Sequence, residues 1–320
     1  MEIQGGYVMG TTMKKTKRPT PVALYGLTHV LHLELVMQKV LVMLPLVDLD
    51  AFLTTLHPHK DLKWLQEESE LWKELLIMHF GGRRELTSAQ ASEDGDSDAG
   101  EDDESTEEPV MRTVWLPKRG YCLEMHEFVL SLEEYEHFRS HFRIVRDDIG
   151  SITEIEGNQI DAIAFPTNPY LHNPHMGVAA VVFRRAGEEL DEHVETLEMV
   201  LHPGEAHTTP GFGTGVRSLI HCHGPHLHQP DCFEILSQTY TSVLEEAMEE
   251  NTKVLALTSI STGNFGMPIP DATRVGVRAI QSYYRKHHRW DTTVAVVCYE
   301  ADVYEAFQDT LQKTLAAFNT

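Results

Sequence analysis

The sequence predicts an α/β fold: a three-layer α/β/α sandwich on a mixed, largely parallel sheet, preceded by a small helical N-terminal region. Short apolar runs rich in β-branched residues alternate with segments of helical periodicity through the back half of the 320-residue chain. Strands separated by helices of this length form parallel sheets that are covered on both faces. A strongly acidic stretch divides this half from a front half whose apolar residues recur at helical spacing.

The predicted strands and helices of the back half follow one another in regular order. The strands lie at residues 142–145, 161–165, 218–222, 254–257 and 293–298. The helices lie at about residues 176–186, 231–249, 268–287 and 301–317. Because ligands of open α/β sheets bind beyond the carboxyl ends of the strands, a site is expected in the loops that follow these strands.

The front half is predicted to be helical and to follow a short basic start. Segments 44–53 and 70–76 resemble the beginning and end of an F-box, which implies a ubiquitin-ligase scaffold as a partner. The family separates these segments with a middle helix that carries a cysteine and a tryptophan, and residues 61–69 are too few to hold it in full. The alternative is a helical extension that packs on itself or on the main domain. Polar residues interrupt the apolar stretch 22–47, so we expect no membrane span.

The net charge of −23 argues against nucleic acid as a partner, because phosphate binding needs clustered lysine and arginine. Ten acidic residues fall between positions 93 and 108, among Ser, Gly and Ala, which is the composition of a disordered spacer. We therefore expect a basic start at 1–20, a helical region at 21–84, an acidic linker at 85–110, a connecting segment at 111–139 and the α/β domain at 140–320.

The cysteines predict a reducing compartment. The four residues Cys122, Cys222, Cys232 and Cys298 form no paired framework, and no signal peptide is recognisable, so we expect the cytoplasm or the nucleus.

The stretch Ser261–Pro268 directly follows the apolar run 254–257 and precedes a predicted helix. Its two glycines allow the backbone to turn tightly enough to direct several N–H groups at one point, and the helix adds the positive end of its dipole. Such a loop holds a phosphate without a basic side chain. The alternative is a plain turn, which is the commoner role of this composition.

Further motifs occur at the predicted strand ends, in a fixed order. They are Asp147–Ile149, Asp161–Asn168, Gly177–Ala180 and Gly204–Phe212, the last followed by Leu219–Pro225, and Ser261–Pro268 completes the series. Together they resemble a macro domain, the ADP-ribose-binding fold, over about residues 140–320. The resemblance implies ADP-ribose or an ADP-ribosylated protein as the partner, and no cofactor.

The resemblance also implies a role for each candidate residue. Asp148 would accept a hydrogen bond from the adenine amine while Ile149 donates from its backbone. Asn168 would bind the distal ribose, and Phe265 would lie beside that ribose. Tyr299 would pack against the proximal ribose or adenine, or else be an interior aromatic residue. The diphosphate would be held by backbone N–H groups of Ser261, Thr262, Gly263, Asn264 and Phe265. Gly177, Val178 and Gly266 are further expected ligand-binding residues of the same cleft.

Departures from the family favour binding over catalysis. Phe165 stands where the family has the first of two asparagines, and residues 173–177 keep one glycine of the family's glycine run. Ground-state binding survives such changes more easily than a held water molecule does. The alternative is an ADP-ribosyl hydrolase of the same fold with Asn168 as its catalytic residue, and a further alternative is a ubiquitin-ligase adaptor that recruits ADP-ribosylated targets. His172 and His175 are also expected to face the distal ribose.

A second cluster contains histidines and cysteines between positions 221 and 232. The spacing matches no closed zinc pattern, and alternation suits a buried strand end. We therefore predict no metal site.

Overall fold

The computed structural model describes residues 34–56, 63–83 and 122–320, and the chain divides into two compact units, Met1–Leu71 and Trp72–Thr320. The basic start at 1–20, the acidic linker at 85–110 and the beginning of the connecting segment lie outside the described residues. Among the described residues, no helix is both long and apolar enough to cross a membrane.

The first unit is helical in its described part. It contains α2 (Glu34–Met43), α3 (Leu46–Leu56), α4 (Lys63–Glu67) and the first residues of α5 (Ser69–Phe80). Helix α2 ends before Pro45, as expected because the residue before a proline avoids helical geometry. Met37, Leu41, Leu49 and Leu65 are buried. These helices confirm the predicted helical region, while the F-box resemblance stays a prediction.

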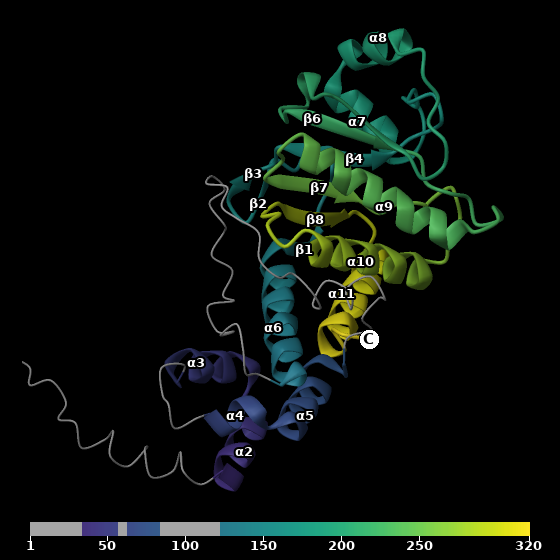
Figure 1. Cartoon of the computed structure of the whole chain (residues 1–320). Helices are drawn as coiled ribbons and strands as arrows, with labels where there is room; N and C mark the ends of the chain where they lie inside the picture. The colour runs from purple at the N-terminus through teal and green to yellow at the C-terminus, as the bar shows by residue number, and fades with distance from the viewer. Residues whose placement is uncertain (1–33, 57–62, 84–121) are drawn as a thin grey trace, which may run out of the picture. The chain divides into compact units, whose positions relative to one another are not determined.

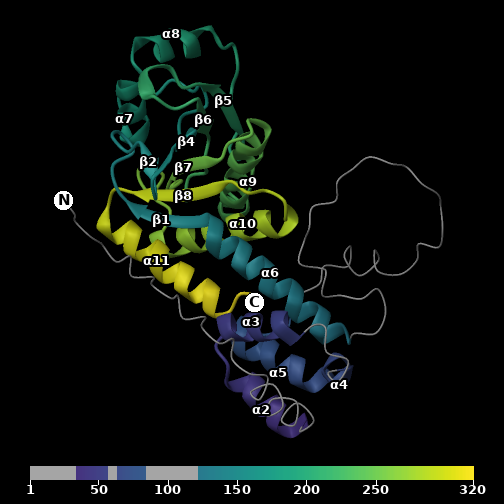
Figure 2. The same cartoon turned by 90° about the vertical axis from the view of Figure 1, so that its left-hand side faces the viewer.

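The second unit contains a six-stranded sheet in the order β1-β8-β7-β4-β6-β5 (Figures 1 and 2). Its strands are β1 (Phe142–Arg146), β4 (Ala162–Pro166), β5 (Ala206–Pro210), β6 (Ser218–Cys222), β7 (Val254–Thr258) and β8 (Thr293–Cys298). All neighbours pair in parallel except β5, which runs antiparallel to β6 at one edge. This arrangement confirms the predicted mixed, largely parallel sheet.

Helices cover both faces of the sheet, so the predicted three layers are present. Ile163 and Phe165 of β4 pack with Val182 and Phe183 of α7 (Gly177–Ala186) in one apolar cluster. The side chains of α9 (Cys232–Glu249) and α10 (Ile269–Lys286) form the layer on the other face (Figures 1 and 2). Helix α11 (Ala301–Ala316) follows β8, and the four predicted helices therefore exist.

Several elements of the second unit were not predicted. They are the hairpin of β2 (Glu154–Ile155) and β3 (Asn158–Gln159), helix α8 (Glu188–Thr196), strand β5, the single turn η4 (Phe212–Thr214) and helix α6 (Leu123–His141). Helix α6 occupies most of the segment predicted to be a connection, and it leads directly into β1. The first residues of the predicted domain are therefore the end of a long helix.

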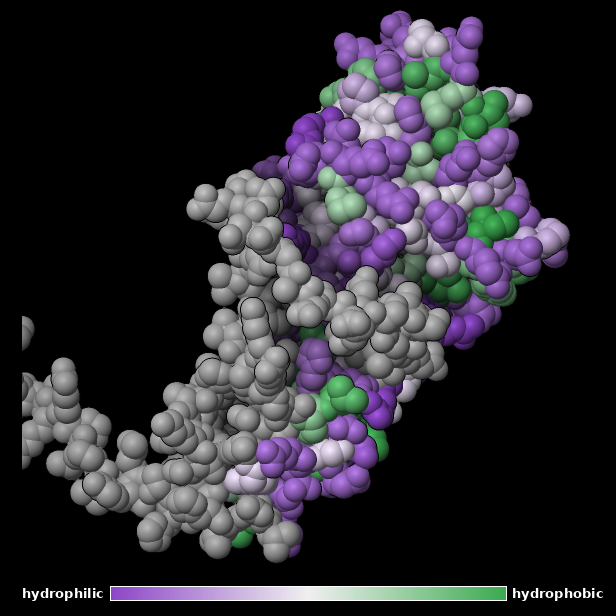
Figure 3. Space-filling model, in the orientation of Figure 1, coloured by the Kyte–Doolittle hydropathy of each residue, from purple (hydrophilic) through white to green (hydrophobic). Residues whose placement is uncertain are grey.

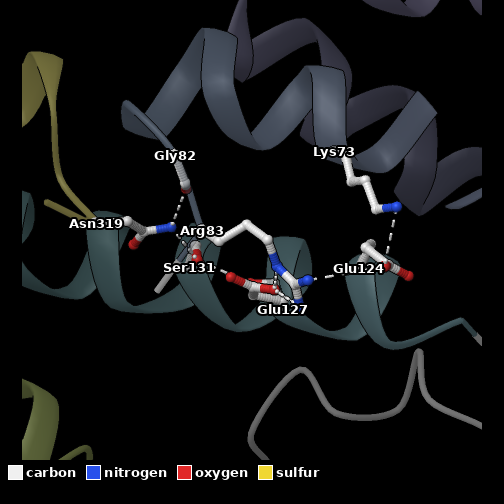
Figure 4. A network of polar contacts seen from close by, with 7 residues as sticks. All are labelled: Lys73, Gly82, Arg83, Glu124, Glu127, Ser131 and Asn319. Carbon is white, nitrogen blue, oxygen red and sulfur yellow. Dashed lines mark hydrogen bonds and ion pairs between the residues drawn. The ribbon is translucent and has the colours of Figure 1, made fainter. Parts of the chain in front are cut away.

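A polar network joins α6 to the end of α5 and to the C-terminal residues (Figure 4). Arg83 pairs with Glu127 at 2.8 Å, and Lys73 lies 3.7 Å from Glu124. Asn319 Nδ2 donates to Gly82 O at 3.2 Å and to Ser131 Oγ at 2.9 Å.

Aromatic packing supports this network, because the rings of Trp72 and Phe80 lie 5.2 and 5.3 Å from that of Phe128.

In the space-filling view, the hydrophobic residues of the second unit are scattered among hydrophilic ones on the face shown (Figure 3).

Candidate functional site

A cavity of about 620 Å³ lies at the carboxyl ends of β1, β8, β7 and β4. Its volume falls within the range of about 300–1,000 Å³ that is usual for small-molecule sites. The residues that line it are Asp147, Asp148, Ile149, Pro166, Thr167, Asn173, Met176, Gly177, Val178, Val181, Thr258, Ser259, Ser261, Thr262, Gly263, Asn264, Phe265, Ile269, Val297, Tyr299, Glu300, Asp302 and Val303. Four loops and the beginnings of helices α7, α10 and α11 therefore contribute to one site.

The loop after β7 presents a row of backbone donors to this cavity. Residues 261–265 are five in succession, and none of their N–H groups donates to another group in the described chain. The loop is fixed at its ends by Met267 N, which donates to Ser261 O at 3.0 Å, and by Gly266 N, which donates to Gly263 O at 2.9 Å. Successive N–H groups held in this way form an anion-binding concavity.

The conformation of this loop depends on particular residues. Ser261 has a φ of 63°, in the left-handed region that few residues other than glycine adopt. Ser259 Oγ and Thr262 Oγ1 lie 2.7 Å apart, and Ile260 N donates to the hydroxyl of Tyr240 in α9 at 3.2 Å. A Cβ at Gly263 would have no atom within 4 Å, so this position opens onto free space.

Three helix N-termini lie at the cavity. Gly177, Ile269 and Asp302 line it, and each lies in the first turn of its helix, α7, α10 or α11. The unpaired N–H groups of a first turn carry a partial positive charge, equivalent to about half an elementary charge per helix. No lysine or arginine is among the residues that line the cavity.

Asp148 lies at the other end of the cavity, after β1. Its Oδ1 accepts the N–H of Gly150 at 2.8 Å, and its carbonyl accepts the N–H groups of Ser151 and Ile152 at 3.0 and 2.9 Å. Asp148 therefore caps a turn, while Oδ2 accepts no hydrogen bond within the described residues and can accept one from a ligand.

The backbone of Ile149 is held so that its N–H group is available. Its carbonyl accepts Arg185 Nη1 at 2.8 Å, whereas its N–H donates to no group in the described chain. Arg185 Nε donates to Thr214 O at 3.0 Å. Burial lowers the pKa of the Arg185 guanidinium and the charge of Asp148 opposes that shift, so the arginine stays a cation that fixes this turn.

The comparisons with known proteins assign a family. The family model described as Macro domain matches residues 164–276. A macro domain-containing protein of Methanosarcina mazei is 31% identical over 159 residues, which cover 49% of this chain and 83% of that protein. One of Xanthomonas axonopodis pv. citri is 30% identical over 180 residues, which cover 52% of this chain and 96% of that protein. The chain belongs to the macro domain family.

Two solved macro domains are similar to part of this chain. That of Oceanobacillus iheyensis with ADP is 26% identical, with a TM-score of 0.49 over 54% of this chain and 90% of that chain. That of Trypanosoma brucei in complex with ADP-ribose is 22% identical, with a TM-score of 0.49 over 55% and 71%. The matched segments leave about half of the present chain outside the macro domain comparisons.

Most of the predicted ligand-binding residues of this macro domain meet at the cavity. Asp148, Ile149, Gly177, Val178, Ser261, Thr262, Gly263, Asn264, Phe265 and Tyr299 line it. Tyr299 is 71% exposed, so it lies at the mouth and is not an interior aromatic residue. Phe265 stacks on His226, with ring centroids 3.8 Å apart.

Asn168 and Gly266 do not line the cavity. Asn168 Nδ2 donates to His172 O at 2.7 Å, and Oδ1 accepts Tyr170 N at 3.0 Å, so both ends of its amide hold the loop that it begins. Its predicted catalytic and ribose-binding roles stay predictions.

The two histidines expected at the distal ribose do not line the cavity either. His172 bonds to Asp191 at 3.2 Å, and His175 is exposed. Asn173 and Met176 of the same loop line the cavity in their place.

Sequence reasoning missed other lining residues, among them Thr167 and three carboxylates, Asp147, Glu300 and Asp302. Each lies within a few residues of a strand end, and that position is the signal that could have found them. Thr167 follows β4 immediately, and its N–H donates to Cys222 O at 2.8 Å.

The histidine and cysteine cluster is buried at His221, Cys222, His223 and Cys232 and exposed at His226 and His228. His221 is fully buried, shares a hydrogen bond of 3.0 Å with Thr209 Oγ1 and packs against Phe165, with ring centroids 4.7 Å apart and the rings tilted by 58°. Burial lowers the pKa of His221 to about 3, so its ring is neutral. The described residues include no group of three side chains that could hold a metal ion.

Proposed function

We propose that this macro domain binds ADP-ribose, free or linked to a protein. The row of five unpaired backbone N–H groups at residues 261–265 carries the proposal, because it fits a diphosphate. Asp148 and Ile149 provide an acceptor and a donor for an adenine edge at one end of the same cavity. Membership of the macro domain family supports this ligand over other diphosphates.

No basic side chain lines the cavity. This lining fits a ligand that is bound by directed hydrogen bonds from backbone N–H groups more than by ion pairs. Four carboxylates, Asp147, Asp148, Glu300 and Asp302, line the cavity and repel anions that are not held by the loop. A polyphosphate without an adenine and a sugar gains only the loop contacts. We therefore expect ADP-ribose to bind more tightly than ADP, and pyrophosphate to bind weakly.

The proposal is binding and not hydrolysis. Catalysis by Asn168 would require its amide to reach a water molecule or the ribose, and that amide is bonded to His172 O and Tyr170 N outside the cavity lining. The ubiquitin-ligase scaffold predicted from residues 44–80 stays a prediction, and no contact of the described residues bears on it.

Isothermal titration of the full chain with ADP-ribose tests the proposal, with ADP, AMP and pyrophosphate as comparison ligands. We expect saturable heat with ADP-ribose and weaker binding of AMP, which lacks the diphosphate. No heat at millimolar ADP-ribose from a sample with a cooperative unfolding transition would refute it. Release of ADP-ribose from a modified protein by the same sample would show that hydrolysis had been wrongly set aside.

A further inference from the structure

The loop after β7 has few contacts with the rest of the protein over residues 263–266. Gly263 and Gly266 are exposed, and a Cβ at either position would meet no atom within 4 Å. Among the described residues, the hydrogen bond that joins this part of the loop to another segment runs from Leu227 N to Phe265 O, at 3.1 Å. Because a mobile loop loses conformational entropy when it binds a ligand, contacts that hold Phe265 in place favour binding.

The ring of Phe265 packs on a histidine from the loop after β6. The ring centroids of Phe265 and His226 lie 3.8 Å apart, and the rings are tilted by 36°. Phe265 is half-buried and lines the cavity, whereas His226 is exposed and does not line it. The ring of His223 is farther from that of Phe265, at 6.3 Å and edge-on. His226 therefore supports the Phe265 ring from outside the cavity.

The loop after β6 is itself fixed by contacts away from the cavity. His223 at its beginning donates its N–H to Glu205 O at 3.0 Å, and its Nδ1 lies 2.9 Å from Leu201 O. Gln229 N donates to His226 O at 3.0 Å, which closes a turn that begins at His226. The position of the His226 ring thus depends on the loop after β6 and its neighbours.

The loops after β6 and β7 meet at two points, although β4 lies between these two strands in the sheet. At the first point, a Cβ at Gly224 would overlap Ser261 Oγ and would lie 2.6 Å from Ile260 Cγ2, so the two segments pass in close contact. At the second point, the His226 ring and the backbone beside it hold Phe265. The loop after β6 therefore contacts both the first and the last residue of the row of five N–H donors.

We infer that His226 is a positioning residue for ADP-ribose binding, because its ring holds Phe265 and with it the last of the five backbone donors. This inference rests on the proposed function. His226 acts through Phe265, since it contacts the loop and does not line the cavity. One aromatic pair is worth about two- to tenfold in an equilibrium constant, so its loss is measurable as weaker binding.

Titration calorimetry of the full chain with ADP-ribose tests the inference on three variants. His226→Ala removes the ring, and His226→Phe keeps an aromatic ring at the same position. His228→Ala is the matched control, because His228 is an exposed histidine of the same loop without a ring contact in the described residues. We expect His226→Ala to bind ADP-ribose about two- to tenfold more weakly than His228→Ala, and His226→Phe to restore the affinity of the original.

ADP and AMP separate positioning of the loop from a general loss of structure. ADP carries the diphosphate, whereas AMP lacks it and depends least on the loop after β7. We expect His226→Ala to weaken the binding of ADP as well as that of ADP-ribose, and to leave AMP binding and the melting temperature of the free protein nearly unchanged.

Several results would overturn the inference while leaving the proposed function intact. They are equal ADP-ribose affinity of His226→Ala and His228→Ala, failure of His226→Phe to restore binding, and an equal loss of AMP affinity or a large drop in melting temperature in His226→Ala. Failure of the unmodified protein to bind ADP-ribose would instead overturn the proposed function and the inference together.

Discussion

Gly263→Glu should abolish or strongly weaken ADP-ribose binding without unfolding the protein. A Cβ at this position meets no atom within 4 Å, and Gly263 is not among the glycines with a positive φ, so the backbone accepts a side chain. Gly263 lines the cavity, so a glutamate there brings a carboxylate close to the space proposed for the diphosphate. Stability of the free protein should therefore stay within about 0.5 kcal/mol of the original.

The size of the effect follows from the charge that is introduced. A carboxylate about 5 Å from one phosphate charge costs about 3 kcal/mol at an effective dielectric constant of about 20, and about 1 kcal/mol at that of water. These energies correspond to affinity losses of about 150-fold and about 5-fold. The exposed position of Gly263 favours the lower part of this range in salt.

Titration calorimetry of three variants separates charge from bulk. Gly263→Gln has nearly the same volume as the glutamate variant without the charge, and Gly263→Ala adds one methyl group to open space. We expect the alanine variant to bind nearly as the original, and the glutamate variant to bind more weakly than the glutamine variant by a margin that shrinks at high ionic strength. Affinity of Gly263→Glu within twofold of the original would refute the assignment of the diphosphate to this loop.

Three further predictions concern the fold that holds the site. Gly224→Ala should destabilise the protein by about 1–3 kcal/mol in urea unfolding, because its Cβ overlaps Ser261 Oγ and approaches Ile260. Gly263→Ala is the matched control and should not destabilise the protein. Equal stability of the two variants would contradict the close packing at Gly224. Arg83→Met should lower the free energy of unfolding by about 1–3 kcal/mol, because it removes this cation from the buried Glu127 carboxylate. Lys313→Met is the control: it breaks an exposed pair with Asp309 and should lower that free energy by about 0.5 kcal/mol or less. Similar losses in both variants would show that burial of the ion pair does not matter here. Because burial lowers the pKa of His221 to about 3, the unfolded chain binds the proton first as the pH falls below about 6.5, so stability should drop by up to about 1.4 kcal/mol per pH unit between about pH 6.5 and 3. His221→Gln should flatten that part of the pH dependence in urea unfolding, and an unchanged slope would show that His221 is not its source.

The elements that could be predicted from the sequence are those whose burial follows a simple local pattern, either burial at every position or burial of one helix face. β6 and β7 are buried at every position, and they contain the apolar runs 219–220 and 254–257. Helices α9 and α10 have apolar faces at helical spacing and begin soon after a loop signal. The order of these elements was enough to predict a parallel sheet and the edge at which a site forms.

The missed elements depend on partners far away in the chain. Helix α6 buries Glu127 and Glu134, which pair with Arg83 and Arg285, so acidic residues interrupt the pattern that would reveal its buried face. Strand β5 is short and carries threonines and a histidine, and it becomes a strand because β6 presents an edge to it. No local pattern records either partner.

The same distinction separates Asn168 from Thr167. The sequence by itself determined the donor loop at residues 261–265, since its glycines, its position after a strand and the helix that follows are all local features. Which neighbour at the end of β4 faces the cavity was decided only by the tertiary structure. The backbone of Thr167 is fixed by Cys222 of another strand, whereas the Asn168 side chain bonds to Tyr170 and His172 of the loop that it begins. The pairing of β4 with a distant strand is not recorded in any local pattern of the sequence.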